Sequence, residues 1–323
     1  MKEGALLRKG WGLVRRALLD PPSPHAAIEV RPGAVAAVRL QAQGGKSTLA
    51  AAALVEIPPG TLAVSMMEPN IKDPAAFRQA LRSVVEKTGI LGAGKVALVL
   101  PDPVARVALL DAAEIKPRGR TDGEEMIRFR LRKAVPFEIR DARLAVAPLP
   151  APPGAKAQIL VGAILRSILL EYEDPCRELG LEPVIVTLSG IAIQEVVAAS
   201  AAPGDDLLVI NWDEGYVSLL LSRAQGLVLV RSLTGASAAS PEAVARELAQ
   251  TILYYRERLG GLGLKRVVLR SAALPPDEAS RTVEAAAGQR PEILDPWGAL
   301  SASEPGSAQL LAGAAAILAK RAA

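Results

Sequence analysis

The alternation of hydrophobic and polar positions is clearest between Asp205 and Gly235. This stretch holds three apolar runs separated by short polar or glycine-containing turns, at residues 207–210, 216–221 and 227–233. Runs of this length between such turns predict β-strands joined as hairpins. A weaker copy of the pattern lies near the N-terminus, at residues 26–30, 34–40 and 47–57. The chain is therefore expected to contain two similar three-stranded units.

Each unit is followed by segments with helical spacing of apolar residues. One helix is predicted from Pro74 to Lys87 after the N-cap Asp73, and another after the N-cap Ser240 and Pro241. Further helices are expected at residues 124–135, 165–179, 190–199, 277–287 and 308–321, and further strands at 95–100, 104–110, 144–149, 158–164, 183–188 and 266–269. Two such units predict a duplicated α/β fold with a cleft between its halves.

The composition limits the kinds of site that the chain can carry. The 323 residues are 50% hydrophobic, which is enough to fill the cores of two lobes. No apolar run approaches the roughly 20 residues that cross a bilayer, and residues 1–20 lack the apolar block of a secretory signal. A cytoplasmic protein is expected. A single cysteine, Cys176, excludes an internal disulfide, and with His25 as the single histidine no metal site is expected.

The net charge of +4 and the pI of 9.3 fit a nucleic-acid or anionic-lipid surface, and they also fit many proteins that bind neither. Without an aromatic-rich basic patch, nucleic-acid binding is not expected. Residues 6–19 predict a short basic amphipathic helix before a proline-rich linker at 20–24. On an anionic membrane this helix would make its contacts through Leu7, Trp11, Arg15 and Leu18. The alternative is a helix that docks on its own domain or frays.

Two stretches resemble phosphate-binding loops but lie in the wrong context. Residues 89–95, GILGAGK, have Val96 where a magnesium-binding hydroxyl should follow, and they join a predicted helix to a strand. A phosphate-binding loop runs from a strand to a helix, so that the helix N-terminus faces the phosphate. Residues 44–48, GGKST, lie between two predicted strands. Neither stretch is interpreted as a nucleotide site.

Several stretches in sequence order resemble the PilM family, the actin-like cytoplasmic proteins of type IV pilus assembly, which are similar in fold to FtsA. They include IEVRPGAVAAVRL from Ile28, KVALVLPDPVARVALL from Lys95, RFRLRKAVPFEI from Arg128, LLVINWDEGYVSLLL from Leu207 and ILDPWGAL from Ile293. The resemblance implies a duplicated actin-like, ribonuclease H-like fold of two lobes. Its expected parts are an N-terminal helix and linker at 1–25, a first lobe at 26–103 and 160–200, an inserted subdomain at 104–159, and a second lobe at 201–323.

The departures from the family pattern are informative. In nucleotide-binding relatives each phosphate hairpin carries Asp-x-Gly, whereas this chain has Glu29-Val30-Arg31 and Asn211-Trp212-Asp213. The glycine-rich strand end of the family aligns with Arg270, Ser271 and two alanines, and only Gly235 remains of a paired-glycine turn. The resemblance therefore predicts a degenerate nucleotide cleft that is collapsed, with no catalytic residue and no cofactor.

Arg31 and Asp213 take equivalent positions in the two hairpins. The hypothesis is that they form an ion pair across the cleft and replace the magnesium-bridged phosphates. The alternative is that both side chains point into solvent from ordinary turns. ATP and magnesium would be the cofactors only if the cleft were functional.

The resemblance implies a scaffold on the inner membrane of a pilus or secretion machine. Its partner would be the short cytoplasmic N-terminal peptide of a bitopic membrane protein, bound beside the inserted subdomain. The candidate contacts are Arg128, Arg132, Val135, Pro136 and Phe137. The alternatives are a solvated helix face for the arginines and core packing for Phe137.

Other functions stay open at the level of sequence. One is an active actin-like ATPase or kinase, and another is a cytoskeletal filament protein; a homo-oligomer is compatible with any of these readings. The cytoplasmic domain of a type II secretion protein of the GspL kind would require a membrane-spanning helix near the C-terminus. Residues 310–318 are too short for such a helix.

Overall fold

The computed structural model describes residues 24–43, 46–92, 94–115, 122–149, 156–202, 204–223, 226–296 and 308–322. The amphipathic helix predicted to contain Leu7, Trp11, Arg15 and Leu18 lies outside these residues. Within the described part of the chain, no helix combines the length and the apolar character that crossing a bilayer requires.

The first lobe is built on a five-stranded sheet with the order β3-β2-β1-β4-β8. Its strands are β1 (Ala26–Arg31), β2 (Ala34–Gln43), β3 (Lys46–Glu56), β4 (Lys95–Leu100) and β8 (Glu182–Leu188). The first three pair antiparallel as consecutive hairpins, and β4 and β8 continue the sheet in parallel with β1. Because helices cover both faces, β1 and β4 are almost wholly buried and read as continuous apolar runs.

The second lobe repeats this sheet with the order β11-β10-β9-β12-β13. Its strands are β9 (Asp206–Asp213), β10 (Tyr216–Arg223), β11 (Gly226–Thr234), β12 (Arg266–Ser271) and β13 (Glu292–Ile293). Again the first three pair antiparallel, and β12 and β13 add in parallel. The duplication predicted from the two hairpin units is therefore confirmed.

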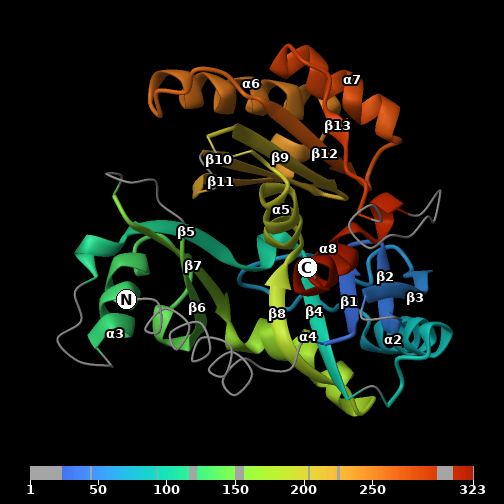
Figure 1. Cartoon of the computed structure of the whole chain (residues 1–323). Helices are drawn as coiled ribbons and strands as arrows, with labels where there is room; N and C mark the ends of the chain where they lie inside the picture. The colour runs from blue at the N-terminus through green and yellow to red at the C-terminus, as the bar shows by residue number, and fades with distance from the viewer. Residues whose placement is uncertain are drawn as a thin grey trace, which may run out of the picture.

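Helices separate and cover the two sheets (Figure 1). The helices α5 (Ser189–Ala199) and α8 (Ala312–Ala322) lie between the sheets and share one apolar core with both. The outer face of the first sheet packs on α2 (Pro74–Thr88) and α4 (Arg166–Glu178), and that of the second on α6 (Pro241–Glu257) and α7 (Pro276–Ala287). The two lobes are thus joined through a common apolar layer.

Two predicted helix starts have the N-cap hydrogen bonds that the sequence indicates. The carboxylate of Asp73 accepts hydrogen bonds from the N–H groups of Ala75 and Ala76, and the hydroxyl of Ser240 accepts one from Ala243. The stretch from Gly89 to Lys95 joins α2 to β4, so the helix-to-strand context predicted for GILGAGK is confirmed.

A third sheet, in the order β5-β7-β6, forms the inserted subdomain with the helix α3 (Asp122–Leu131). Its strands are β5 (Arg106–Asp111), β6 (Ala142–Pro148) and β7 (Gln158–Leu165). All of β7 belongs to this sheet, so the subdomain extends beyond the predicted boundary at Ile159 to Leu165.

Two predicted elements of the subdomain have different bounds. The basic helix predicted at residues 124–135 ends at Leu131, because the chain turns back and buries Val135 and Ile139 beside Ile127. The strand predicted from Val104 begins at Arg106, since a short 3₁₀ turn at Asp102–Val104 precedes it. Both differences come from tertiary packing that overrides the local pattern.

Candidate functional site: the cleft between the lobes

The ends of β1 and β9 meet between the lobes through a two-bonded ion pair. The Nε atom of Arg31 lies 2.9 Å from Oδ2 of Asp213, and its Nη2 atom lies 2.8 Å from Oδ1. Both side chains are buried, with exposed fractions of 3% and 0%. The ion pair predicted from the equivalent hairpin positions is present, and the solvent-exposed alternative is wrong. The matched geometry of guanidinium and carboxylate makes this a strong contact.

Arg270, at the end of β12, is fully buried at the centre of the same cluster. Its Nη1 atom donates to Asp213 Oδ2 at 2.7 Å and to Asn211 Oδ1 at 2.9 Å. Its Nε atom donates to the carbonyl of Gln309 at 2.8 Å, and Nη2 lies 3.4 Å from Glu29 Oε1. Arg270 therefore links β9, β1 and the segment that leads into α8.

Glu29 supplies the carboxylate on the side of the first lobe. It accepts hydrogen bonds from the hydroxyl of Ser189 and from the N–H of Ala314, each at 3.0 Å. Ser189 begins α5 and Ala314 lies in the first turn of α8, so the carboxylate occupies the positive end of two helices. The close approach requires Gly313, since a Cβ atom there would lie 2.5 Å from Glu29 Oε1.

Asp102 completes the cluster from the end of β4. It accepts hydrogen bonds from the N–H of Gly190 at 2.7 Å and from the side-chain amide of Asn211 at 2.8 Å. A Cβ atom on Gly190 would lie 2.6 Å from the Asp102 carboxylate. This residue was not predicted as a cleft residue. The available signal was an acidic side chain two residues after the buried apolar run of β4.

Burial and ion pairing act in opposite directions on these ionisable groups. Burial raises the pKa of Asp213, but the guanidinium groups of Arg270 and Arg31 outweigh it and hold the pKa well below its usual value. Burial lowers the pKa of Arg270, yet Asp213 and Glu29 leave it raised overall. For Asp102, burial is the largest effect and its pKa is raised. The positive charges of Arg31 and Arg270 are therefore balanced by carboxylates within the cluster.

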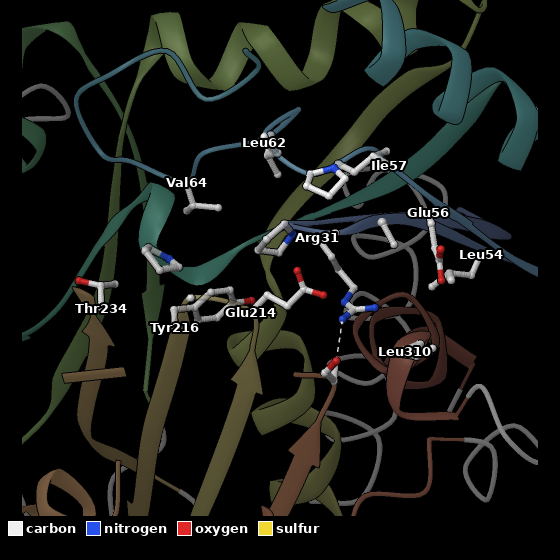
Figure 2. Close-up of a pocket in the computed structure, with 18 of the residues that line it drawn as sticks. Arg31, Leu54, Glu56, Ile57, Leu62, Val64, Glu214, Tyr216, Thr234 and Leu310 are labelled. Carbon is white, nitrogen blue, oxygen red and sulfur yellow. Dashed lines mark hydrogen bonds between the residues drawn. The ribbon is translucent and has the colours of Figure 1, made fainter. Parts of the chain in front are cut away.

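A cavity of about 790 Å³ remains above this cluster, between the two hairpin turns (Figure 2). Arg31 and Gly33 line it from the β1–β2 turn, and Glu214, Gly215 and Tyr216 line it from the β9–β10 turn. The predicted collapse is therefore incomplete: side chains fill the floor of the cleft, and its outer part stays open. The Glu214 carboxylate crosses the cleft, because a Cβ atom built on Gly33 would lie 2.7 Å from it.

The remaining predicted cleft residues lie around this cavity. Gly235 lines the cavity with a φ of 57°, a conformation that favours glycine. Ser271 is buried beside Arg270, and its hydroxyl donates to the carbonyl of Leu274 at 2.8 Å. Trp212 packs into the core of the second lobe. Of the six predicted cleft residues, Arg31 and Gly235 line the cavity; the other four, Glu29, Asn211, Asp213 and Ser271, are buried.

The five predicted partner-binding residues do not share one exposed surface. Arg128 forms an ion pair with Glu124 and donates to the carbonyls of Ile139 and Ala142, so it ties α3 to the start of β6. Val135 is buried, and Phe137 packs against the subdomain core. Only Pro136 and Arg132 are exposed. Arg132 lies 5.5 Å from the ring of Phe129, a 69% exposed residue that sequence analysis did not single out.

A separate groove lies between α2, α4 and the loop before α2. Its volume is about 400 Å³, and its walls are mainly apolar, including Ile71, Phe77, Leu170 and Pro175. Leu170 lines the groove and is 44% exposed, so its side chain is accessible to a ligand there. The groove is a candidate site for an extended apolar peptide.

The described residues contain no group of three or more His, Cys, Asp or Glu side chains arranged to hold a metal ion. Cys176 is buried in α4, and burial raises the pKa of its thiol to about 12. His25 is exposed. The buried, neutral thiol is therefore not a reactive cysteine.

Comparison with known proteins identifies the architecture. No family model and no curated protein sequence matches the chain. A chain of a PilM-PilN type IV pilus biogenesis complex matches with a TM-score of 0.75 and 20% identity, over 94% of this chain and 99% of that chain. A Bacteroides thetaiotaomicron protein of actin-like ATPase fold and unknown function matches with a TM-score of 0.52 and 9% identity, over 84% and 91%. The chain therefore has the two-lobed actin-like fold that the sequence predicts, in the arrangement found in the PilM-PilN structure.

Proposed function

We propose that the chain is a non-catalytic scaffold of a type IV pilus or related secretion machine, on the cytoplasmic side of the inner membrane. In this proposal it binds a short peptide of a membrane partner and does not use ATP. The observation that supports the absence of ATP binding is the closed floor of the cleft, in which Arg31 and Arg270 are both paired with buried carboxylates.

A triphosphate would have to compete with these internal carboxylates. Removing one partner of a buried ion pair typically costs about 3–5 kcal/mol, because the other charge stays buried and uncompensated. The cavity above offers no compensation, since its other charged lining residues are Glu56 and Glu214. A magnesium-bound phosphate chain would therefore gain few contacts and would disrupt strong ones.

The partner is inferred from the shared fold and from the groove between α2 and α4. The matched structure is a complex of PilM with PilN, so a corresponding membrane partner is proposed for this chain. An extended apolar peptide is complementary to the walls formed by Ile71, Phe77 and Leu170. The groove replaces the site predicted around Val135 and Phe137, because those side chains are committed to the subdomain core.

A pull-down with peptides copied from the cytoplasmic tails of pilus inner-membrane proteins tests this proposal. Leu170→Asp should reduce retention of a bound peptide by at least about tenfold, since it places a charge in the apolar groove. Leu253→Asp is the matched control, because Leu253 is also exposed on a helix but lies on α6 in the second lobe. Equal retention by the Leu170→Asp variant and the wild-type chain would contradict docking in this groove.

The alternative function is an actin-like ATPase, which the open cavity of about 790 Å³ favours. In that case nucleotide would enter between the hairpin turns, and the Arg31–Asp213 pair would have to open. Hydrolysis of ATP that disappears when Glu29 is changed to Gln would support this alternative.

A further inference from the structure

The cavity between the lobes carries an excess of negative charge. Its charged lining residues are Arg31, Glu56 and Glu214, and the charge of Arg31 is neutralised by Asp213 in the floor. Among the described residues, neither Glu56 nor Glu214 forms an ion pair with a basic side chain. A ligand in this cavity therefore meets two carboxylates and no available cation.

Tyr216 adds a polar group that is almost completely buried. Its side chain is only 2% exposed and lines the cavity, and Figure 2 shows its ring pointing towards the middle of the cavity. No hydrogen bond is found between this hydroxyl and the described residues, and the hydroxyl is not among the fully buried polar atoms that lack a partner. It is therefore open to the cavity, where water or a ligand can satisfy it.

The rest of the wall is mainly aliphatic. Leu54, Ile57, Leu62, Val64 and Leu310 line the cavity together with several prolines. Figure 2 shows Glu214 extending into the middle of the cavity and Glu56 at its side, near Leu54. Two separated carboxylates on an aliphatic wall are complementary to ammonium groups at the ends of a methylene chain.

We propose that this cavity binds a small aliphatic polyamine. Its ammonium groups would pair with Glu56 and Glu214, one N–H would donate to the hydroxyl of Tyr216, and its methylene chain would contact the aliphatic wall. The site thus selects a ligand of opposite charge to the nucleotide that the fold accommodates in other proteins. The inference goes beyond the scaffold proposal and does not depend on it, because the groove at Leu170 is separate from this cavity.

Other ligand classes fit the same walls less well. An anionic ligand would be repelled by both glutamates. A metal ion needs several oxygen ligands close together, and no such group exists in the described part of the chain. A wholly apolar ligand would remove the two carboxylates from water without pairing them, which is unfavourable.

Isothermal titration of the full chain with spermidine at low ionic strength tests the proposal. One saturable site is expected, and butylamine, which carries one ammonium group, should bind at least about tenfold more weakly. Glu214→Gln and Glu56→Gln should each weaken spermidine binding about tenfold and reduce its advantage over butylamine. Tyr216→Phe should weaken binding several-fold. Glu284→Gln removes the same charge from an exposed position on α7 and should leave the affinity unchanged.

Melting curves of each variant, with a midpoint equal to that of the wild-type chain, establish that the substitutions act on the site and not on folding. The proposal would be overturned by the absence of saturable spermidine binding. Equal weakening by Glu284→Gln, or displacement of spermidine by magnesium at the same concentration, would also overturn it. ATP binding would contradict the scaffold proposal, but it would not change the expected differences in spermidine affinity between the wild-type chain and its variants.

Discussion

The guanidinium group of Arg270 is surrounded by protein on all sides, and its hydrogen-bond acceptors come from both lobes. A different side chain at this position would leave these buried acceptors without a donor. Asp213 and Glu29 are also fully buried, so they depend on Arg270 and Arg31 for compensation of their charge. The stability of the interlobe contact therefore rests on a small number of side chains.

Arg270→Met should lower the free energy of unfolding by about 3–5 kcal/mol, because two buried carboxylates lose a partner. Urea denaturation at neutral pH measures this change. Arg78→Met is the matched control, since Arg78 pairs with Glu178 on the surface and both side chains are about half exposed. That control should change stability little. A wild-type urea midpoint for Arg270→Met would show that the cluster does not stabilise the fold.

Cys176 offers a pH-dependent test of the packing beneath α4. Burial raises the pKa of its thiol to about 12, so the neutral form dominates at every pH below that value. Reaction with a thiol reagent at pH 8 should be at least about a thousandfold slower than for free cysteine. The rate should rise about tenfold per pH unit from pH 7 to 10 without levelling off. A plateau near the pKa of free cysteine would indicate reaction from an opened state of α4.

A contact between two cleft residues was predictable only where the residues take equivalent positions in the two duplicated hairpin units. Arg31 and Asp213 were paired because they take the same position in two equivalent hairpins. The central role of Arg270 was not predicted, although its position among replaced glycines was noted. Asp102 was missed, because its partners Gly190 and Asn211 lie far away in the sequence and meet it only after both lobes have folded.

At the scale of elements, a carboxylate on β1, in the sheet of the first lobe, fixes the start of α8. Glu29 on β1 accepts from the N–H of Ala314, and Gly313 allows its approach. This contact satisfies an N–H group of the first helical turn, which has no partner within the helix. The C-terminal helix is therefore held at its start by the same cluster that closes the cleft.

Gly313→Ala should lower stability by about 1–3 kcal/mol, because the new methyl group would displace the buried Glu29 carboxylate. Helix propensity alone favours alanine over glycine, by about 1 kcal/mol, so the sign of the effect is diagnostic. Thermal unfolding measures it. Gly162→Ala is the control, because a Cβ atom there meets no atom within 4 Å. A stabilised Gly313→Ala variant would contradict the proposed contact.

Most elements were predictable because their apolar spacing and end signals agree. Asp73 before α2 and Ser240 before α6 identified helix starts that the structure confirms. Two exceptions lie in the inserted subdomain, where α3 ends at Leu131 and β7 extends to Leu165, and the two-residue strand β13 was not predicted. In the subdomain the chain segments are short, and a small core of residues distant in sequence decides where each element ends.

At the scale of the whole molecule, the two sheets with the same strand order face each other across α5 and α8 (Figure 1). The duplication was predictable because the two hairpin units are visible in the apolar pattern of the sequence, whereas the layer of α5 and α8 between the sheets was not predicted. The sequence could not predict the cavity that remains above the ion cluster, since that volume depends on how closely the two hairpin turns approach. The result is a two-lobed fold whose lobes are connected by its own charged side chains.

The most direct test of this account is the melting temperature of the full chain with and without millimolar ATP and magnesium. A ligand that binds the native state raises the melting temperature as its concentration exceeds its dissociation constant. No shift is expected, because the carboxylates of Glu29 and Asp213 already occupy the guanidinium groups that a triphosphate would require. A rise of several degrees that increases with ATP concentration would contradict the account.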